Sequence, residues 1–516
     1  MLRLTIRFVY LSLLIFATCN VYSADYLLDN DKLCQGFPRA RIGSLDGTCV
    51  GVVALKHEGM LRPRKILEIE PNHFLITDMG GWVANKGSLW SLKILGPGKS
   101  ELVQLKSGLD QVHGLAMDSK KRIYFGERSR ITRFEINSEE LVFETVVNNL
   151  PSEGKHALTH FIIDEQDRLI VNRGAPSDQC LNSKGKPQYP CPEVEGENPE
   201  AALYRLTLDE SGNVIKSELL ARGLRNSMGL AIHPESGILL QADNGMDFNK
   251  ESLPHDELNV IKPDKHYGWP YCFDQNQLNP NYKRTIFNRS VPKINCSGFE
   301  NPSVLLGAHS APLDMFFYKG SMFPELNQKL IVSYHGYQPA GHRISFLDLN
   351  LSGFAKDEEK NILFDWDAKR GIRPQGSPVG ITEAHDGKIW FVEDKNNSIM
   401  FISTTSEIFD DTTSEVPQVS LARLDEAGRR HLNNLSTKLF QPVCSTCHAV
   451  FAEKDLEVLH QKLFTENMLD LDNPQQSELS KRVHGLGGGM MMPPGGSVSE
   501  EMKNELKDYL DTIKKN

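Results

Sequence analysis

The sequence predicts an all-β six-bladed β-propeller followed by a small all-α domain, and two observations support this. Short apolar strands recur in pairs through the middle of the chain, with acidic or glycine turns inside each pair and no helical stretch between pairs. After Ile402 a Ser-, Thr-, Asp- and Pro-rich stretch gives way to helical spacing. We therefore expect a signal peptide at 1–23, a propeller at 24–403, a linker at 404–420 and a helical domain at 421–516.

The first element in the chain is the expected signal peptide. Two arginines precede the apolar run 8–17, and Val21-Tyr22-Ser23 offers small residues for cleavage before the mature chain. The run is too short to be a permanent membrane span, and no later stretch resembles one. Cys19 leaves a lipoprotein open as an alternative, although Phe16-Ala17-Thr18 is a poor lipobox. We expect export to the periplasm.

The mature chain is acidic. The formal net charge is −10, and loss of the two leader arginines makes it −12. This balance disfavours nucleic acid or an anionic membrane as a partner. It suits a neutral small-molecule substrate and a basic electron acceptor.

The propeller is predicted from six pairs of strands. They are 65–69 with 73–78, 114–118 with 122–126, 161–164 with 168–171, 229–233 with 238–243, 314–317 with 329–333, and 380–382 with 388–392. A β-sandwich or solenoid would show more even spacing, while seven blades remain open. The inserts at 173–200 and 264–305 are expected to be loops on a propeller face, where binding groups usually lie.

Six of the nine cysteines lie outside the leader and outside the pair at 444 and 447. An even number in an exported protein predicts disulfides. Pairing of sequence neighbours is the simplest of the 15 connectivities, and the others stay open. It would join Cys34 with Cys49, Cys180 with Cys191, and Cys272 with Cys296.

The helical domain carries the segment Cys444-Ser445-Thr446-Cys447-His448, the attachment signature of a c-type haem. Cys444 and Cys447 would bind the haem vinyl groups, and His448 would ligate the iron. A thioredoxin-like redox pair, a zinc half-site or chance are the alternatives. In the downstream segment 489–494, Met492 is the expected second axial ligand, with Met490 and Met491 as substitutes and a loop without iron contact as the alternative. Residues 421–516 are therefore expected to be a cytochrome c domain.

A final helix is expected near the C-terminus. Ser497-Val498-Ser499-Glu500 is a possible capping box. The apolar positions that follow fall on one helix face: Met502, Leu506, Tyr509, Leu510 and Ile513. This face would cover the haem or pack against the helix that precedes Cys444.

Four segments of the propeller resemble one enzyme family. They are His156 with Phe161–Asp164, then Gly223–Leu230, Asp256–Asn259 and Tyr267–Cys272. Together, over roughly residues 50–403, they resemble the pyrroloquinoline quinone (PQQ)-dependent soluble aldose dehydrogenases and sorbosone dehydrogenases. The resemblance implies a sugar substrate, hydride transfer to PQQ and a bound calcium ion.

Candidate catalytic and PQQ-binding residues follow from this resemblance. Oxidation of an alcohol or hemiacetal requires a base near an electrophilic carbonyl, and His156 matches the family base. His160 is the substitute candidate for the base. The alternative for His156 is a structural histidine that is hydrogen-bonded between blades. Arg225 and Asn226 match the pair that contacts the quinone end, where Arg suits carboxylates and developing negative charge; a surface loop is the alternative.

Further site residues are expected with less support. Arg343 and Arg373 are candidates for the PQQ carboxylates. The resemblance assigns calcium to the main-chain carbonyls of Gly268 and Pro270. The chain departs from the family in having no Arg at 157–160, which affects substrate choice. His309-Ser310-Ala311-Pro312 resembles a motif of the sorbosone dehydrogenases and would line the sugar site.

The predicted function is that of a periplasmic quinohaemoprotein dehydrogenase. A sugar would reduce PQQ, and electrons would pass to haem c and on to an external acceptor such as a soluble cytochrome or a respiratory-chain component. One alternative is a calcium-dependent propeller lactonase or related hydrolase, with Asp78, Asp243 and Asp394 at the axis. A second is a non-catalytic binding propeller that docks the cytochrome to a partner complex.

Overall fold

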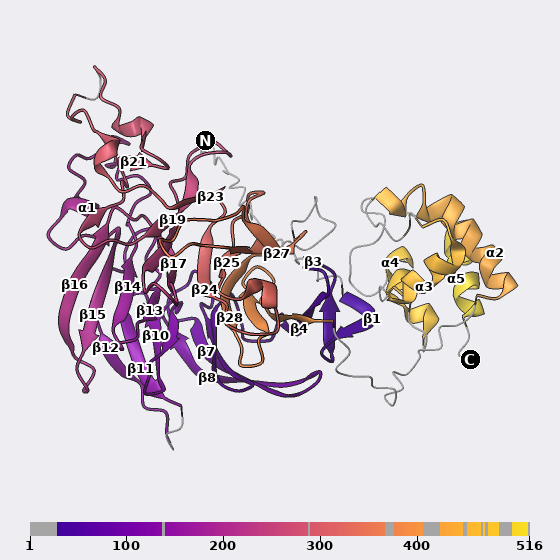
Figure 1. The fold of residues 1–516 in the computed structure, drawn as a ribbon. Helices are drawn as coiled ribbons and strands as arrows, with labels where there is room; N and C mark the ends of the chain where they lie inside the picture. Colours follow the sequence, from indigo (N-terminus) through magenta and orange to yellow (C-terminus); the bar gives the residue numbers. More distant parts are fainter. Residues whose placement is uncertain are drawn as a thin grey trace, which may run out of the picture. The chain divides into compact units, whose positions relative to one another are not determined.

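The computed structural model describes residues 28–136, 140–286, 289–366, 376–405, 424–446, 451, 453–465, 468–469, 473–484 and 498–513. The chain divides into two compact units, Met1–Thr405 and Ser406–Asn516 (Figure 1). The expected signal peptide and most of the expected linker lie outside the described residues, as do Arg373, Cys447, His448 and Met490–Met492.

The first unit is a six-bladed β-propeller, as predicted. Each blade has four antiparallel strands. The first blade consists of β5 (Pro63–Glu70), β6 (His73–Asp78), β7 (Gly87–Gly96) and β8 (Lys99–Leu109), and the second of β9 (Leu115–Met117), β10 (Arg122–Glu127), β11 (Arg130–Glu135) and β12 (Glu144–Val147). The third blade consists of β13 (Phe161–Ile163), β14 (Leu169–Arg173), β15 (Ala202–Leu208) and β16 (Val214–Arg222), and the fourth of β17 (Ser227–Ile232), β18 (Leu239–Asp243), β19 (His255–Val260) and β23 (Val304–Ala308). The fifth blade consists of β24 (Pro312–Phe317), β25 (Leu330–Tyr334), β26 (Arg343–Leu347) and β27 (Lys360–Phe364), and the sixth of β28 (Pro378–Glu383), β29 (Ile389–Glu393), β30 (Ser398–Thr404) and β4 (Thr48–Leu55). The six predicted strand pairs are the first two strands of the six blades.

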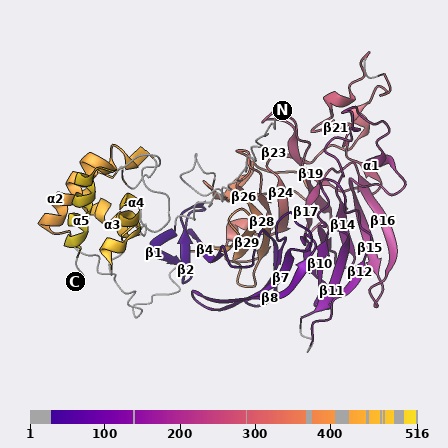
Figure 2. The same ribbon diagram turned by 180° about the vertical axis from the view of Figure 1, so that it is seen from behind.

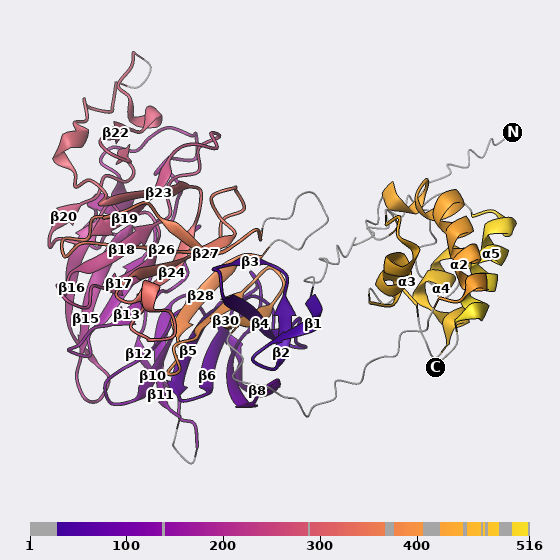
Figure 3. The ribbon, with the colours of Figure 1, turned by 45° about the vertical axis from the view of Figure 1, so that its right-hand side comes forward.

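A strand from the start of the chain closes the ring. β4 pairs with β30 in the last blade, and β2 (Phe37–Ala40) and β1 (Leu28–Cys34) extend this sheet (Figure 3). Gly51 in β4 lies against the ring of Phe401, where a Cβ atom would come within 2.3 Å of the ring. The short β3 (Gly43–Ser44) pairs with β27 of the neighbouring blade. Closure of this kind leaves few exposed sheet edges.

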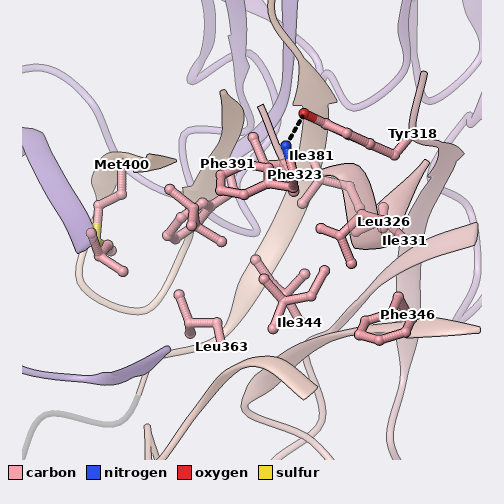
Figure 4. Close-up of a cluster of buried hydrophobic side chains, with 14 of the residues drawn as sticks. Tyr318, Phe323, Leu326, Ile331, Ile344, Phe346, Leu363, Ile381, Phe391 and Met400 are labelled. Carbon is pink, nitrogen blue, oxygen red and sulfur yellow. Dashed lines mark hydrogen bonds between the residues drawn. The ribbon is translucent and has the colours of Figure 1, made fainter. Parts of the chain in front are cut away.

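The propeller core lies between the blades. Figure 4 shows Ile331 and Ile344 of the fifth blade in one cluster with Phe391 and Met400 of the sixth, and all four side chains are buried. Tyr318 joins this cluster, and its hydroxyl accepts a hydrogen bond from the Phe323 N–H at 3.2 Å, beside η3 (Pro324–Leu326). Because both faces of a blade pack against neighbours, strands such as β29 carry consecutive apolar residues rather than strict alternation.

The two long inserts form a loop layer fixed by disulfides. This layer contains α1 (Pro192–Glu195), β20 (Lys265–His266), β21 (Cys272–Phe273), β22 (Gln277–Leu278), η1 (Pro280–Tyr282) and η2 (Cys296–Gly298). Cys180 pairs with Cys191, and Cys272 with Cys296; elsewhere Cys34 pairs with Cys49. The pairing of sequence neighbours is therefore confirmed.

The second unit is helical in its described residues (Figure 2). It contains α2 (Glu426–Leu435), η4 (Ser436–Phe440), η5 (Cys444–Thr446), α3 (Leu456–Thr465), η7 (Pro474–Gln476), α4 (Glu478–His484) and α5 (Glu500–Thr512). The expected last helix is confirmed as α5. The side chain of Ser499 caps it by accepting the Met502 N–H at 3.3 Å.

The apolar face of α5 packs against α2, the helix that precedes Cys444. Leu432 and Leu435 of α2 and Leu506 and Tyr509 of α5 are buried in one cluster. Glu505 fixes the register by accepting hydrogen bonds from His431 at 2.9 Å and Asn434 at 2.8 Å. Among the described residues of the chain, no helix is long and apolar enough to span a membrane.

Candidate active site

A cavity of 610 Å³ lies at one end of the propeller axis. Its walls come from the loops that precede inner strands and from the loops between second and third strands. In four-stranded antiparallel blades these loops all lie at the same end. The cavity contains His156 before β13, Arg225 and Asn226 before β17, the loop 244–251, and the segment 335–338. Its volume lies in the range typical of small-molecule sites.

His156 lies in this cavity as a neutral imidazole. Its Nδ1 is 2.6 Å from the carbonyl oxygen of Ala175, so Nδ1 carries the hydrogen and donates it. The other nitrogen, Nε2, is then the basic one. Burial, together with the nearby Arg225 charge, lowers the pKa of His156 to about 3. His156 is therefore unprotonated at neutral pH and its Nε2 lone pair can accept a proton, although a pKa this low makes it a weak base until the surroundings stabilise the imidazolium.

Arg225 is held rigidly beside His156. Its guanidinium donates to the Asp178 carboxylate from Nε at 3.0 Å and from Nη2 at 2.8 Å, and Nη2 also donates to Asp247 at 3.0 Å. Nη1 donates to the carbonyl oxygen of Asn244 at 3.0 Å. The Arg225 carbonyl in turn accepts the Ala175 N–H at 2.8 Å, which links the arginine to the residue that orients His156.

Two buried carboxylates fix the backbone of the cavity. Asp243 accepts the N–H groups of Arg225 at 2.9 Å and Asn226 at 2.7 Å. Asp256 accepts those of Gly245 and Ala311, both at 2.7 Å. Burial raises the pKa of both carboxyl groups, in Asp243 to about 6, although these hydrogen bonds oppose the shift. Their contacts indicate that they position the loops.

His335 brings a second imidazole to the cavity. Its Nε2 is 2.8 Å from Asp394, whose other oxygen accepts from Arg64 at 2.5 Å. Burial raises the pKa of Asp394, but His335 and Arg64 outweigh it and lower that pKa to about 2. Tyr337 packs its ring on His335 at 5.2 Å and also lines the cavity.

The structure brings His156, Arg225, Asn226 and His309 together at this cavity. His309 donates from Nε2 to the carbonyl oxygens of Lys250 at 3.0 Å and Leu253 at 3.1 Å. His160 does not line the cavity; it is fully buried at the axis.

Arg343 lies outside the cavity. Its guanidinium donates to Ser345, Asn361 and Glu359, and it stacks over the ring of Tyr334 at 4.2 Å. These contacts hold Arg343 against β26 and its neighbours, and it is not among the residues that line the cavity.

Gly268 and Pro270 do not line the cavity either, and their carbonyls accept hydrogen bonds within their own segment. The Gly268 carbonyl accepts the N–H groups of Tyr271 and Cys272, and the Pro270 carbonyl accepts from Asn279 at 2.8 Å. The same segment contacts a residue that binds Arg225, because Trp269 Nε1 donates a hydrogen bond to the Asp178 carbonyl oxygen at 2.9 Å.

The three axial aspartates are not brought together. Asp78 accepts from Leu61 and Ser88, Asp243 fixes the backbone before β17, and Asp394 pairs with Arg64. In the described part of the chain, no group of three metal-ligating side chains occurs at this cavity.

Sequence reasoning missed Asp178 and Asp247, the partners of Arg225. Asp178 lies in the insert 173–200, two residues before the disulfide cysteine Cys180. An acidic residue that a disulfide fixes in a propeller insert was the signal that could have marked Asp178 as a site residue. Asp247 lies within the loop 244–251, and nothing in its spacing connects it with Arg225.

One residue of the expected haem site is described. Cys444 begins η5, directly after the helical stretch α2–η4, and it packs against the apolar core of the second unit. The other residues of the attachment signature lie outside the described residues.

Comparisons with known proteins match the propeller. The chain is 36% identical over 253 residues to an uncharacterized protein of Borreliella burgdorferi, covering 47% of this chain and 59% of that protein. It is 26% identical over 263 residues to aldose sugar dehydrogenase YliI of Escherichia coli, covering 49% and 65%. These alignments span less than two thirds of either relative.

Solved structures share the fold. The iodide structure of Trichoderma reesei Carbohydrate-Active Enzymes Family AA12 has a TM-score of 0.56 at 19% identity, covering 73% of this chain and 100% of that one. The holo form of the pyranose dehydrogenase PQQ domain from Coprinopsis cinerea has a TM-score of 0.54 at 17% identity, covering 72% and 99%. Residues 52–405 match the TrAA12-like family model, more than half of this chain. The chain therefore belongs to the TrAA12-like family.

Proposed function

We propose that this protein is a PQQ-dependent sugar dehydrogenase that oxidises an aldose or a related alcohol or aldehyde. The observation that carries the proposal is a neutral His156 whose Nδ1–H is held by Ala175, in a cavity that also contains the fixed Arg225 guanidinium. The names of the relatives, an aldose sugar dehydrogenase and a pyranose dehydrogenase PQQ domain, support the same class of reaction.

The residues present fit PQQ, a planar tricarboxylate with an ortho-quinone. Arg225 offers a buried planar guanidinium held in one orientation by Asp178 and Asp247, with one Nη1 hydrogen left for a ligand, and Asn226 lines the same cavity. PQQ would supply the hydride acceptor. Gly268 and Pro270 do not line the cavity, so calcium in it would take oxygen donors from lining residues such as those of the 244–251 loop, Asp247 among them.

The chain's own residues then have distinct tasks. Nε2 of His156 would accept the proton of the sugar hydroxyl, and Ala175 would keep the imidazole in the required tautomer. Asp178 holds Arg225 in place and offsets part of its charge, so the imidazolium formed during proton transfer is less disfavoured.

We further propose that residues 421–516 form a cytochrome c domain. Cys444 and Cys447 would bind the haem and His448 its iron, with Met492 as the second axial ligand. The apolar core on which Cys444 packs would exclude water from the porphyrin. Electrons would pass to an external acceptor such as a soluble cytochrome or respiratory-chain component, in the periplasm, after cleavage of the signal peptide 1–23 and with 404–420 as linker.

Purified protein supplied with PQQ and calcium tests the dehydrogenase proposal. His156→Gln should bind PQQ with unchanged affinity, because the imidazole is proposed to act on the sugar. Its turnover should fall about 10²- to 10⁴-fold, the usual effect of losing a general base. His385→Gln, which changes an exposed histidine outside the cavity, is a matched control that should leave turnover within about twofold of wild type. Full activity of His156→Gln would rule out this base.

The haem proposal has a separate test. Cys447→Ala should abolish stable covalent haem, detected by haem stain after denaturing electrophoresis, while PQQ-dependent dye reduction by the propeller persists. Covalent haem retained in a Cys444→Ala and Cys447→Ala double variant would contradict the assignment.

A further inference from the structure

A group of buried hydrogen-bond donors lies on the propeller axis, outside the catalytic residues proposed above. Arg64 and Lys65 are on β5, His113 precedes β9 and His160 precedes β13. Arg64, His113 and His160 are each at most 4% exposed. Lys65 also lines a second cavity of 340 Å³, whose wall is made by the inner strands of all six blades.

The carboxylates near these donors are already engaged. Asp394 accepts from Arg64 at 2.5 Å and from His335 at 2.8 Å. Asp314 accepts from the Lys65 ammonium and from the Ile381 N–H at 2.8 Å. The two ion pairs make this region electrically balanced.

His113 and His160 each carry an N–H group that has no hydrogen-bond acceptor among the described residues. Arg64 donates from Nε to His113 Nδ1 at 3.1 Å, so a neutral His113 carries its hydrogen on Nε2. The rings of His113 and His160 meet edge to face at 5.5 Å. Within the described part of the chain, neither ring nitrogen of the fully buried His160 has a hydrogen-bond partner. Buried polar atoms are rarely left unpaired, which indicates an occupant.

The chemistry of that occupant follows from the donors. His113 Nε2–H, one N–H of His160 and the remaining hydrogens of the Lys65 ammonium have no carboxylate left to accept them. A buried, electrically balanced site with hydrogen-bond donors in excess of acceptors favours a negative ion over a cation. We propose that the propeller axis binds a small monovalent anion of the halide class between His113, His160 and Lys65.

Proton uptake should accompany this binding. Burial, with Arg64 and Lys65 nearby, holds the pKa of both His113 and His160 well below the usual range. An anion between the rings opposes that effect, and a protonated imidazole would restore the charge balance that the anion disturbs. Halide affinity should therefore rise as the pH falls.

Other groups face the same region and bear on that pH dependence. They are Asp314 of β24, Asp394 after β29, His335 after β25, and Thr77 of β6, whose hydroxyl donates to the His113 carbonyl at 2.7 Å. His335 and Arg64 lower the pKa of Asp394 to about 2, whereas burial raises the pKa of Asp314 despite its ion pair with Lys65, so proton uptake that depends on the imidazoles must be lost in His160→Leu.

Thermal unfolding of the full chain tests the proposal without PQQ, so its outcome is independent of the dehydrogenase assignment. At constant ionic strength, replacing methanesulfonate with bromide should raise the unfolding temperature, because methanesulfonate is larger than a halide and does not resemble a sugar or a sugar acid. His160→Leu should abolish the bromide effect, and His113→Gln should weaken bromide binding about tenfold or more. His385→Gln changes an exposed histidine of the same propeller and should retain the wild-type response.

A crystal soaked in bromide gives the second readout. The expected result is an anomalous peak beside the two rings, within hydrogen-bond reach of His113 Nε2, a ring nitrogen of His160 and the Lys65 ammonium. Water at this position with no anomalous signal, or an equal bromide effect in wild type and His160→Leu, would overturn the proposal.

Discussion

The acid limit of turnover follows from the environment of His156. A histidine with its ordinary pKa near 6.5 would be only about 3% neutral at pH 5, whereas a pKa of about 3 leaves about 99% neutral. The difference in active base is about thirtyfold at that pH. We therefore predict that kcat/KM for the sugar, which reports groups of the free enzyme, changes little between pH 7 and pH 5.

The assay is the initial rate of sugar-dependent dye reduction by the PQQ- and calcium-loaded protein, measured from pH 4 to pH 8 at low sugar concentration. His156→Gln is the control, because any acid limb that it retains belongs to another group or to the dye. A wild-type limb centred near pH 6.5 that disappears in His156→Gln would refute the buried, neutral base.

Three further predictions concern stability. Asp178→Asn should lower the free energy of unfolding in urea by about 3 kcal/mol. This is the lower end for a broken buried ion pair, because Asp247 still binds Arg225. An unchanged urea midpoint would contradict the role of Asp178 in holding Arg225. Replacing Cys180 and Cys191 with Ala opens an 11-residue loop and should cost about 3 kcal/mol, measured against the wild type under oxidising conditions. Leu506→Ala should destabilise the helical unit by about 3 kcal/mol in its own urea transition, and a loss confined to the propeller transition would count against the helical core.

The blades were predictable because their signal is local. Each pair, such as 73–78 with its preceding strand, is a run of apolar residues broken by a turn. Closure was not predictable in the same way, since β4 and β30 are separated by most of the chain and pair only in the folded ring. Thr404, expected to begin the linker, is the last residue of β30 for the same reason.

The site was predictable where a side chain carries the chemistry. His156 and Arg225 were identified from residue type and motif, and they do line one cavity. The assignment of calcium to Gly268 and Pro270 depended on backbone carbonyls, whose direction a sequence motif does not reveal. Asp178 was missed because its contact with Arg225 spans 47 residues and depends on how a disulfide-bonded insert folds back.

The most direct measurement of the central claim is rapid mixing of the oxidised, PQQ- and calcium-loaded protein with an aldose while the reduced haem band is followed. The account predicts sugar-dependent haem reduction that requires PQQ and that falls at least about 10²-fold in His156→Gln. Haem that stays oxidised while the same sample reduces an added dye would contradict the electron path, and no sugar-dependent reduction of either would contradict the dehydrogenase itself.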